Sequence, residues 1–203
     1  MMNMEHTNFE IQDGILKMYH GINKHVVIPE GVMEIGDEAF EDNEFVQVLE
    51  MPSTLVKIDA WLFYGCSCLK DIIINPDNPY MTKIDNCIYS KDKTTLLLYP
   101  PYIKAEKFII PDFVKEIGKM AFYRSSVKTV VCNSGSETID EQAFFSCEKL
   151  EKIYISDTVT EIGDEAFFNC ESLTRINIPG KVKVIKTSVF ENCDSLKEVI
   201  LDG

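Results

Sequence analysis

The chain has 203 residues, of which 45% are apolar and 26% are charged, a balance typical of a folded globular protein. Its formal net charge of -13 argues against nucleic acid or an anionic membrane surface as partners, because both are bound through basic faces. No apolar run approaches the roughly 18 residues of a transmembrane helix, so no segment is predicted to span a membrane.

The first predicted element is an N-terminal cap. Residues 1–8 lack the basic start, apolar core and small-residue cleavage site of a secretory signal. The chain as given is therefore expected to be cytoplasmic, or to be displayed or secreted only if a leader is missing from it. Residues 9–19 then place two β-prone runs around Asp13-Gly14, which predicts a short hairpin.

An internal repeat of about 23 residues follows the cap. Residues 159–178 read VTEIGDEAFFNCESLTRINI, and their apolar positions recur one period earlier and one period later. In all, six copies share this pattern, at residues 32–51, 55–74, 114–130, 139–155, 159–178 and 182–201. The third copy is one residue short.

The offsets within one copy predict its local structure. Leu-x-x-Ile-x-Ile alternates with period two, as a strand with one buried face does. Ile-Gly-x-x-Ala-Phe-x-x-Cys spaces apolar residues by three or four, which indicates a short helical return. Stacked copies predict a leucine-rich-repeat solenoid, an α/β-type right-handed superhelix with a parallel strand sheet on the concave side and short helical returns on the convex side.

The period is interrupted at residues 75–107. Two β-rich runs there flank Lys91-Asp92-Lys93, which predicts a β-hairpin insertion. Both hairpins lead into an apolar strand that ends in Ile-Pro, so both are interpreted as versions of one element. The predicted divisions are an N-terminal cap at 1–25, first repeats at 26–74, the insertion at 75–107 and remaining repeats at 108–203, all in one solenoid domain.

The repeat resembles the BspA-like class of leucine-rich repeats, whose pattern is L-x-x-I-x-I-P-x-x-V-x-x-I-G-x-x-A-F-x-x-C. The resemblance covers most of residues 26–201. Members of that family are bacterial surface and secreted proteins, and some are implicated in adhesion. The resemblance therefore implies a binding role, without naming a ligand.

The cysteines suggest two alternatives, a ladder that binds metal or forms disulfides and a set of buried structural thiols. Four of the seven occupy one repeat position, namely Cys66, Cys147, Cys170 and Cys193. No CxxC pair occurs, and Asn43 and Ser125 replace cysteine in other copies, so buried structural thiols are the preferred interpretation. No metal site and no cofactor are predicted.

The sequence offers no catalytic constellation. His6, His20 and His25 all lie near the N-terminus, and neither a G-x-S-x-G elbow nor a phosphate-binding loop is present. The acidic clusters at 37–44 and 164–165 lack EF-hand spacing and are interpreted as solvated charge. No catalytic residue is predicted, and an enzyme built on the insertion is disfavoured because that stretch contains no histidine.

The candidate binding surface is the outward face of the predicted strands. Alignment of the copies gives one outward column, six of whose eight members are apolar or aromatic: Val27, Glu50, Ile73, Ile109, Val131, Tyr154, Asn177 and Ile200. A mostly polar column that includes Lys152 and Arg175 flanks it. An apolar stripe with a polar border is typical of a partner-binding face, although β-branched residues also simply favour strands.

The leading functional prediction is a protein- or peptide-binding repeat scaffold without catalysis. The alternatives are a cell-surface or secreted adhesin that binds host protein or carbohydrate, and a purely structural spacer. A homodimer is a further possibility, formed through the strand at 199–201 or through the concave face, because an uncapped terminal strand is a pairing edge.

Overall fold

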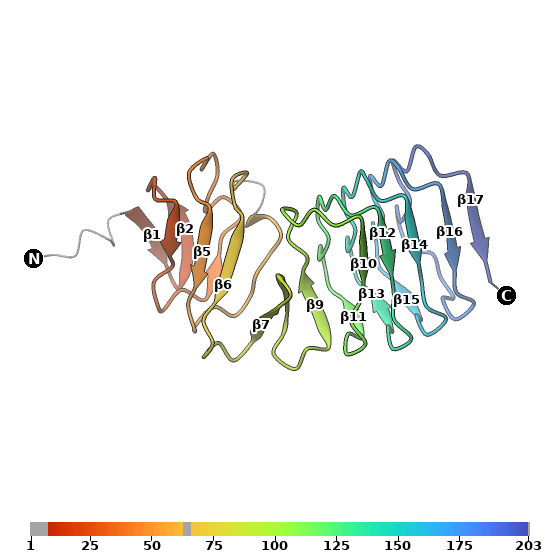
Figure 1. Ribbon diagram of the computed structural model, residues 1–203, viewed down its shortest axis with the longest axis horizontal. Helices are drawn as coiled ribbons and strands as arrows, with labels where there is room; N and C mark the ends of the chain where they lie inside the picture. The colour runs from red at the N-terminus through yellow and green to blue at the C-terminus, as the bar shows by residue number, and fades with distance from the viewer. Residues whose placement is uncertain (1–7, 63–65, 203) are drawn as a thin grey trace, which may run out of the picture. The chain divides into compact units, whose positions relative to one another are not determined.

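The computed structural model describes residues 8–62 and 66–202, and Figure 1 labels most of its strands. The chain divides into two compact units, Met1–Asn86 and Cys87–Gly203. The first unit contains β1 (Phe9–Gln12), β2 (Ile15–Tyr19), β3 (His25–Val27), β4 (Glu34–Ile35), β5 (Val48–Met51), β6 (Asp71–Ile74) and β7 (Met81–Ile84). The second unit contains β8 (Cys87–Ser90), β9 (Thr95–Leu98), β10 (Lys107–Ile109), β11 (Glu116–Ile117), β12 (Thr129–Val131), β13 (Thr138–Ile139), β14 (Lys152–Tyr154), β15 (Glu161–Ile162), β16 (Arg175–Ile178) and β17 (Glu198–Leu201).

The first unit is a short β-solenoid. Its longer strands form a parallel ladder in the order β3-β5-β6, with Val26, Leu49 and Ile72 side by side. The hairpin predicted at residues 9–19 is present as antiparallel β1 and β2. β2 then pairs in parallel with β4, so the hairpin starts a second, shorter ladder.

The second unit repeats this plan over more turns. The longer strands pair in parallel as β10-β12-β14 and as β16-β17, and β14 is not hydrogen-bonded to β16. The short strands β11, β13 and β15 form a parallel ladder that begins on β9. The hairpin predicted around residues 91–93 is present as antiparallel β8 and β9.

The two hairpins occupy equivalent places in their units. Leu16 of β2 is opposite Ile35, and Leu96 of β9 is opposite Ile117. The next contacts also correspond, because the Tyr19 amide donates to the Ala39 carbonyl at 2.8 Å and the Tyr99 amide to the Ala121 carbonyl at 2.7 Å. Each unit therefore begins with a hairpin whose second strand starts the short-strand ladder.

The predicted helical returns are wrong. In the copies whose returns lie wholly within the described residues, the chain returns through tight turns and a two-residue strand, and no helix forms. Left-handed backbone recurs in these returns, with φ of 53° at Glu165 and 59° at Asn169, and again at Gln142 and Ser146 one turn earlier. An α-helix requires φ near -60° at every residue, so two such residues four apart prevent it.

The amides of the returns bond to the next turn instead of closing helical bonds. Phe144 donates to the Ala166 carbonyl at 2.8 Å, and Phe167 one turn later donates to the Val189 carbonyl at 3.0 Å. Gln142 and Ser146 donate across the same gap, each at 2.9 Å. The spacing of apolar residues by three and four is therefore produced by successive tight turns, which direct these side chains into the core.

Close approach between turns explains the glycine in the Ile-Gly pair. A Cβ added to Gly163 would lie 2.3 Å from the amide nitrogen of Glu141, well inside van der Waals contact. At Gly118 it would lie 3.0 Å from the Leu96 carbonyl oxygen. Backbone on the neighbouring turn therefore occupies the space that a side chain would need.

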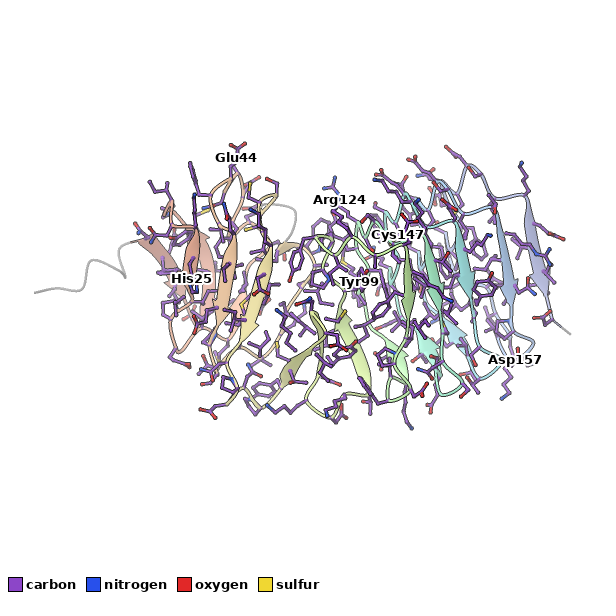
Figure 2. All side chains as sticks on the ribbon, in the orientation of Figure 1. His25, Glu44, Tyr99, Arg124, Cys147 and Asp157 are labelled. Carbon is purple, nitrogen blue, oxygen red and sulfur yellow. The ribbon has the colours of Figure 1, made fainter. Side chains whose placement is uncertain are left out.

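The core of the second unit is built on a ladder of stacked rings, which we call the aromatic ladder: Tyr99, Phe122, Phe144, Phe167 and Phe190. Successive ring centroids are 4.8, 4.7, 5.2 and 5.9 Å apart. Tyr99 lies between the ribbons in Figure 2, whereas Arg124 extends outward. Offset stacking of this kind adds to the hydrophobic gain of burying the rings.

The repeated cysteines pack beside this ladder. The thiol of Cys147 donates to the Phe122 carbonyl at 2.9 Å, that of Cys170 to the Phe144 carbonyl at 3.3 Å, and Cys193 to the Phe167 carbonyl at 3.0 Å. Burial raises the pKa of the Cys147 thiol well above its ordinary value. The thiols thus cap carbonyl groups of the previous turn, as buried structural residues would.

The short-strand ladder of the second unit carries close acidic groups. Glu116, Asp140 and Glu161 line a cavity of about 220 Å³. Burial, with a further contribution from the Asp140 charge, raises the pKa of Glu116 above its ordinary value of 4.5. A carboxyl group whose pKa is raised in the folded state stabilises the fold when protonated and loses that contribution as pH rises.

We expect Glu116→Gln to raise the melting temperature slightly at pH 7, because it removes a partly desolvated charge. The advantage over the parent chain should disappear below about pH 4.5, where the parent carboxyl is protonated in both states. Thermal melts between pH 3.5 and 7 measure this. Glu137→Gln is the matched control, since Glu137 is exposed and pairs with Lys115 at 3.2 Å. A pH-independent difference for Glu116→Gln would contradict the assignment.

Candidate binding face of the strand ladders

The strand register places the predicted outward column in three stretches. Val27, Glu50 and Ile73 are opposite one another in the first unit. In the second unit, one stretch is Ile109, Val131 and Tyr154, and the other is Asn177 opposite Ile200. The divisions fall at the boundary between the units and at the missing hydrogen bonds between β14 and β16.

Exposure along the column varies. Val27, Ile109 and Tyr154 are each exposed by 58–60%, and Ile73 by 38%. Glu50, Val131 and Ile200 are half-buried, and Asn177 is exposed. The stretch of Ile109, Val131 and Tyr154 therefore forms an apolar strip on adjacent, hydrogen-bonded strands, which we call the apolar strip.

Polar residues border the strip. The residues two positions earlier on the same strands are Lys107, Thr129 and Lys152, which are also opposite one another. In the first unit the corresponding residues are His25, Val48 and Asp71. His25 lies 3.2 Å from the Glu50 carboxylate, and Asp71 pairs with Lys83.

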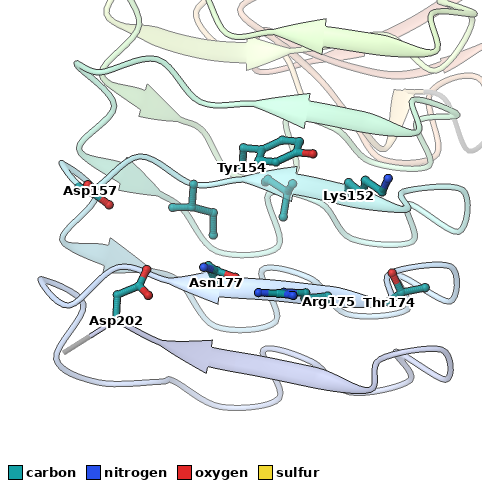
Figure 3. A pocket seen from close by; sticks show the side chains of 9 residues that line it. Lys152, Tyr154, Asp157, Thr174, Arg175, Asn177 and Asp202 are labelled. Atoms are coloured by element: carbon teal, nitrogen blue, oxygen red, sulfur yellow. The ribbon is translucent and has the colours of Figure 1, made fainter.

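A groove lies between β14 and β16, at the place where the strand ladder is not hydrogen-bonded (Figure 3). Its volume is about 520 Å³. Side chains of both strands and of residues that flank β14, β16 and β17 line it: Lys152, Ile153, Tyr154, Ile155, Asp157, Thr174, Arg175, Asn177 and Asp202. The groove therefore brings together Lys152 and Arg175, which the sequence placed beside the column, with two members of the column itself, Tyr154 and Asn177.

Three of these groove residues were missed by the sequence analysis, namely Asp157, Thr174 and Asp202. They fall just outside the strands, and strand periodicity singles out only residues within them. Asp157 follows β14, and Asp202 follows β17. The Asp202 amide donates to the Ile178 carbonyl at 3.0 Å, which places Asp202 beside the end of β16. A comparison of the residues that flank each strand, before its start and after its end, could have found them.

The other polar candidates lie apart from this face. Asp37, Glu38 and Glu41 line a separate pocket with Trp61 on the return side of the first unit. His20 approaches Glu10 at 3.7 Å in the hairpin region, and His6 lies outside the described residues. Across residues 8–62 and 66–202, no three histidine, cysteine or acidic side chains gather closely enough to hold a metal ion together.

Three apolar residues of the last copy are exposed, although the equivalent positions are mostly buried in the other copies. Ile185 and Val199 are each exposed by 42% and Leu201 by 67%. They belong to the last copy, on which no further turn packs among the described residues. Interior positions of a solenoid are buried only when a neighbouring turn covers them.

The fold is that of a leucine-rich-repeat β-solenoid, and the sequence places it in a family. The model of the BspA type leucine rich repeat region matches residues 3–104 and 99–203, with six copies. The chain therefore belongs to the BspA type leucine-rich repeat family. Among the curated proteins, none is similar enough in sequence to count as a relative.

Solved structures of bacterial leucine-rich repeat proteins share the fold. A leucine-rich repeat protein from Eubacterium ventriosum has a TM-score of 0.70 at 22% identity, over 87% of this chain and 54% of that one. The pneumococcal vaccine antigen PcpA has a TM-score of 0.65 at 20% identity, over 88% and 56%. A leucine rich cell surface protein from Faecalibacterium prausnitzii has a TM-score of 0.62 at 25% identity, over 89% and 60%. The chain thus spans little more than half the length of these proteins.

Within the described residues, no helix has the length and apolar character needed to cross a bilayer.

Proposed function

We propose that this chain is a binding scaffold whose outward strand face captures a protein or peptide, and that it carries out no catalysis. The observation that supports this most directly is the apolar strip, in which Ile109 and Tyr154 are each about 60% exposed on hydrogen-bonded strands. Exposed apolar and aromatic side chains with a polar border are characteristic of interfaces. Membership of a repeat-scaffold family supports the same conclusion.

The test is a pull-down from lysate of the source organism with the intact chain immobilised. We expect the double variant Ile109→Glu/Tyr154→Glu to lose at least about tenfold in captured partner, because it places charges at the centre of the interface. Its melting temperature should stay close to that of the parent, since both side chains are exposed.

The matched control is Val184→Glu. Val184 is 67% exposed in the same unit but lies outside the strands. Capture should be unaffected by this substitution. Equal capture by the parent and the double variant would exclude the apolar strip, and absence of any specific partner would favour a structural spacer.

A second candidate is a cell-surface or secreted adhesin that binds host protein or carbohydrate. It is supported by the solved structure described as a leucine rich cell surface protein, which is 25% identical to this chain. Surface labelling of intact cells with a reagent that does not cross membranes tests it. Labelling of the native product would favour the adhesin, and protection until lysis would favour the cytoplasmic location expected for the chain as given.

A homodimer through the β17 edge or the strand face remains a further proposal, which sedimentation of the intact chain tests.

A further inference from the structure

The groove between β14 and β16 has opposite charges at its two ends (Figure 3). Lys152 begins β14 and Arg175 begins β16, so two cationic side chains lie at one end. Asp157 follows β14, and Asp202 follows β17 beside the end of β16, so two carboxylates lie at the other end. A ligand that forms ion pairs at both ends of this groove therefore carries both signs of charge.

The separation of the two ends suits an extended chain. Lys152 and Asp157 are five residues apart and β14 ends at Tyr154, so the two residues are separated by at most about 16 Å, the length of fully extended backbone at roughly 3.3 Å per residue. In an extended peptide, residues i and i+4 project from the same side about 13 Å apart. Flexible lysine and glutamate side chains close the remaining difference.

The middle of the groove is suited to peptide backbone. Tyr154 presents a ring that is 58% exposed, and Asn177 on the facing strand supplies an amide that both donates and accepts hydrogen bonds. Tyr154 also ends the apolar strip, so the groove is continuous with the face assigned above to partner binding.

We propose that this groove binds an extended peptide segment in which an acidic and a basic side chain are separated by three residues. The acidic side chain lies against Lys152 and Arg175, and the basic side chain lies against Asp157 and Asp202. This proposal rests on the proposed function and specifies the chemistry of the segment that the strand face captures.

Arg175 already has a neighbour of opposite charge. One of its guanidinium nitrogens is 3.4 Å from the Glu198 carboxylate, and both side chains are more than half exposed. An exposed pair of this kind is weak, and the planar guanidinium keeps further N–H donors for a ligand carboxylate. No ion pair of Lys152 is found within residues 8–62 and 66–202, so its ammonium is open to a ligand.

Two capped peptides of identical composition test the proposal with the intact chain. Acetyl-Glu-Ser-Val-Ser-Lys-amide has the matching separation, and acetyl-Ser-Glu-Lys-Val-Ser-amide has the same residues with the charges adjacent. In titrations followed by NMR of the isotope-labelled chain, we expect the first to bind about tenfold more tightly, because only it reaches both ends. Its binding should weaken as salt is raised.

Charge reversal of one end gives the sharper result. Lys152→Glu/Arg175→Glu makes both ends acidic, so we expect it to lose the Glu/Lys peptide and to prefer acetyl-Lys-Ser-Val-Ser-Lys-amide. Reversal of both ends, by adding Asp157→Lys and Asp202→Lys, should restore binding of the original peptide in the opposite direction. A switch followed by restoration also shows that the variants are folded.

The control is Lys115→Glu/Lys119→Glu, which changes the net charge equally at exposed residues that lie outside the strands, the apolar strip and the groove. It should leave the preference for the matched peptide intact.

Equal affinity for the two peptides, or unchanged binding after reversal of one end, would overturn the proposal. Binding of a neutral oligosaccharide that ignores every charge reversal would also overturn it. If the pull-down still depends on Ile109 and Tyr154 in that case, the proposed function stands and only the groove assignment fails.

Discussion

Phe144→Ala is expected to lower the free energy of unfolding of the second unit by about 3–5 kcal/mol, the range typical of a buried phenylalanine replaced by alanine. Phe144 is fully buried, and its ring centroid lies 4.7 Å from that of Phe122 and 5.2 Å from that of Phe167. Truncation therefore leaves a cavity between two turns and breaks the aromatic ladder at its centre. Chemical denaturation followed by circular dichroism measures the loss.

The neighbouring residue supplies the matched control. Phe145 is only half-buried and stacks on the outer side of the turns, with its ring centroid 4.8 Å from that of Phe168. Phe145→Ala removes the same atoms but leaves no enclosed cavity, so its effect should be clearly smaller. Equal losses at the two positions would show that burial in the ladder does not determine stability here.

Residues 87–203 expressed alone are expected to fold cooperatively. This segment is a compact unit and contains its own hairpin, in which β9 covers the edge of β11 as β2 covers the edge of β4 in the first unit. A solenoid needs an end that protects its first interior turn and its first strand edge. A single thermal transition in circular dichroism, together with slow amide exchange in β11 and β13, would establish an independent fold.

A shorter fragment tests the role of the hairpin. Residues 100–203 lack β8, β9 and Tyr99, so Phe122 loses a ring at 4.8 Å and β11 loses one of its two parallel partners. We expect this fragment to be unfolded or to aggregate. A stable, monomeric 100–203 fragment would show that the hairpin is a decoration of the solenoid rather than its cap.

Much of the fold could be predicted from local patterns because a repeat imposes the same demand on every copy. Alternation along Arg175–Ile178 identifies a strand, and turn residues at Asp13-Gly14 identify a hairpin. The return segments show the limit of such patterns. Spacing by three or four is shared by an α-helix and by successive tight turns, and the choice depended on amides such as that of Phe144 bonding to the next turn.

The candidate site was likewise predictable from the sequence only in part. Repeat alignment was sufficient to place Ile109, Val131 and Tyr154 side by side, since parallel strands in register keep equivalent residues together. It could not foresee that β14 and β16 lack hydrogen bonds, because nothing in one copy encodes how closely it approaches the next.

The sequence by itself therefore determined the repeat, its family, the alternation of buried and outward residues, and the hairpins, because each depends on residues close together in the chain. Only the tertiary structure decided that the returns are turns, that the outward column is divided into stretches, and that Asp157 and Asp202 share a groove with Lys152 and Arg175. These features depend on how one turn packs on another. That packing is set by backbone conformation and hydrogen bonds across about 23 residues of chain, beyond the reach of any local pattern.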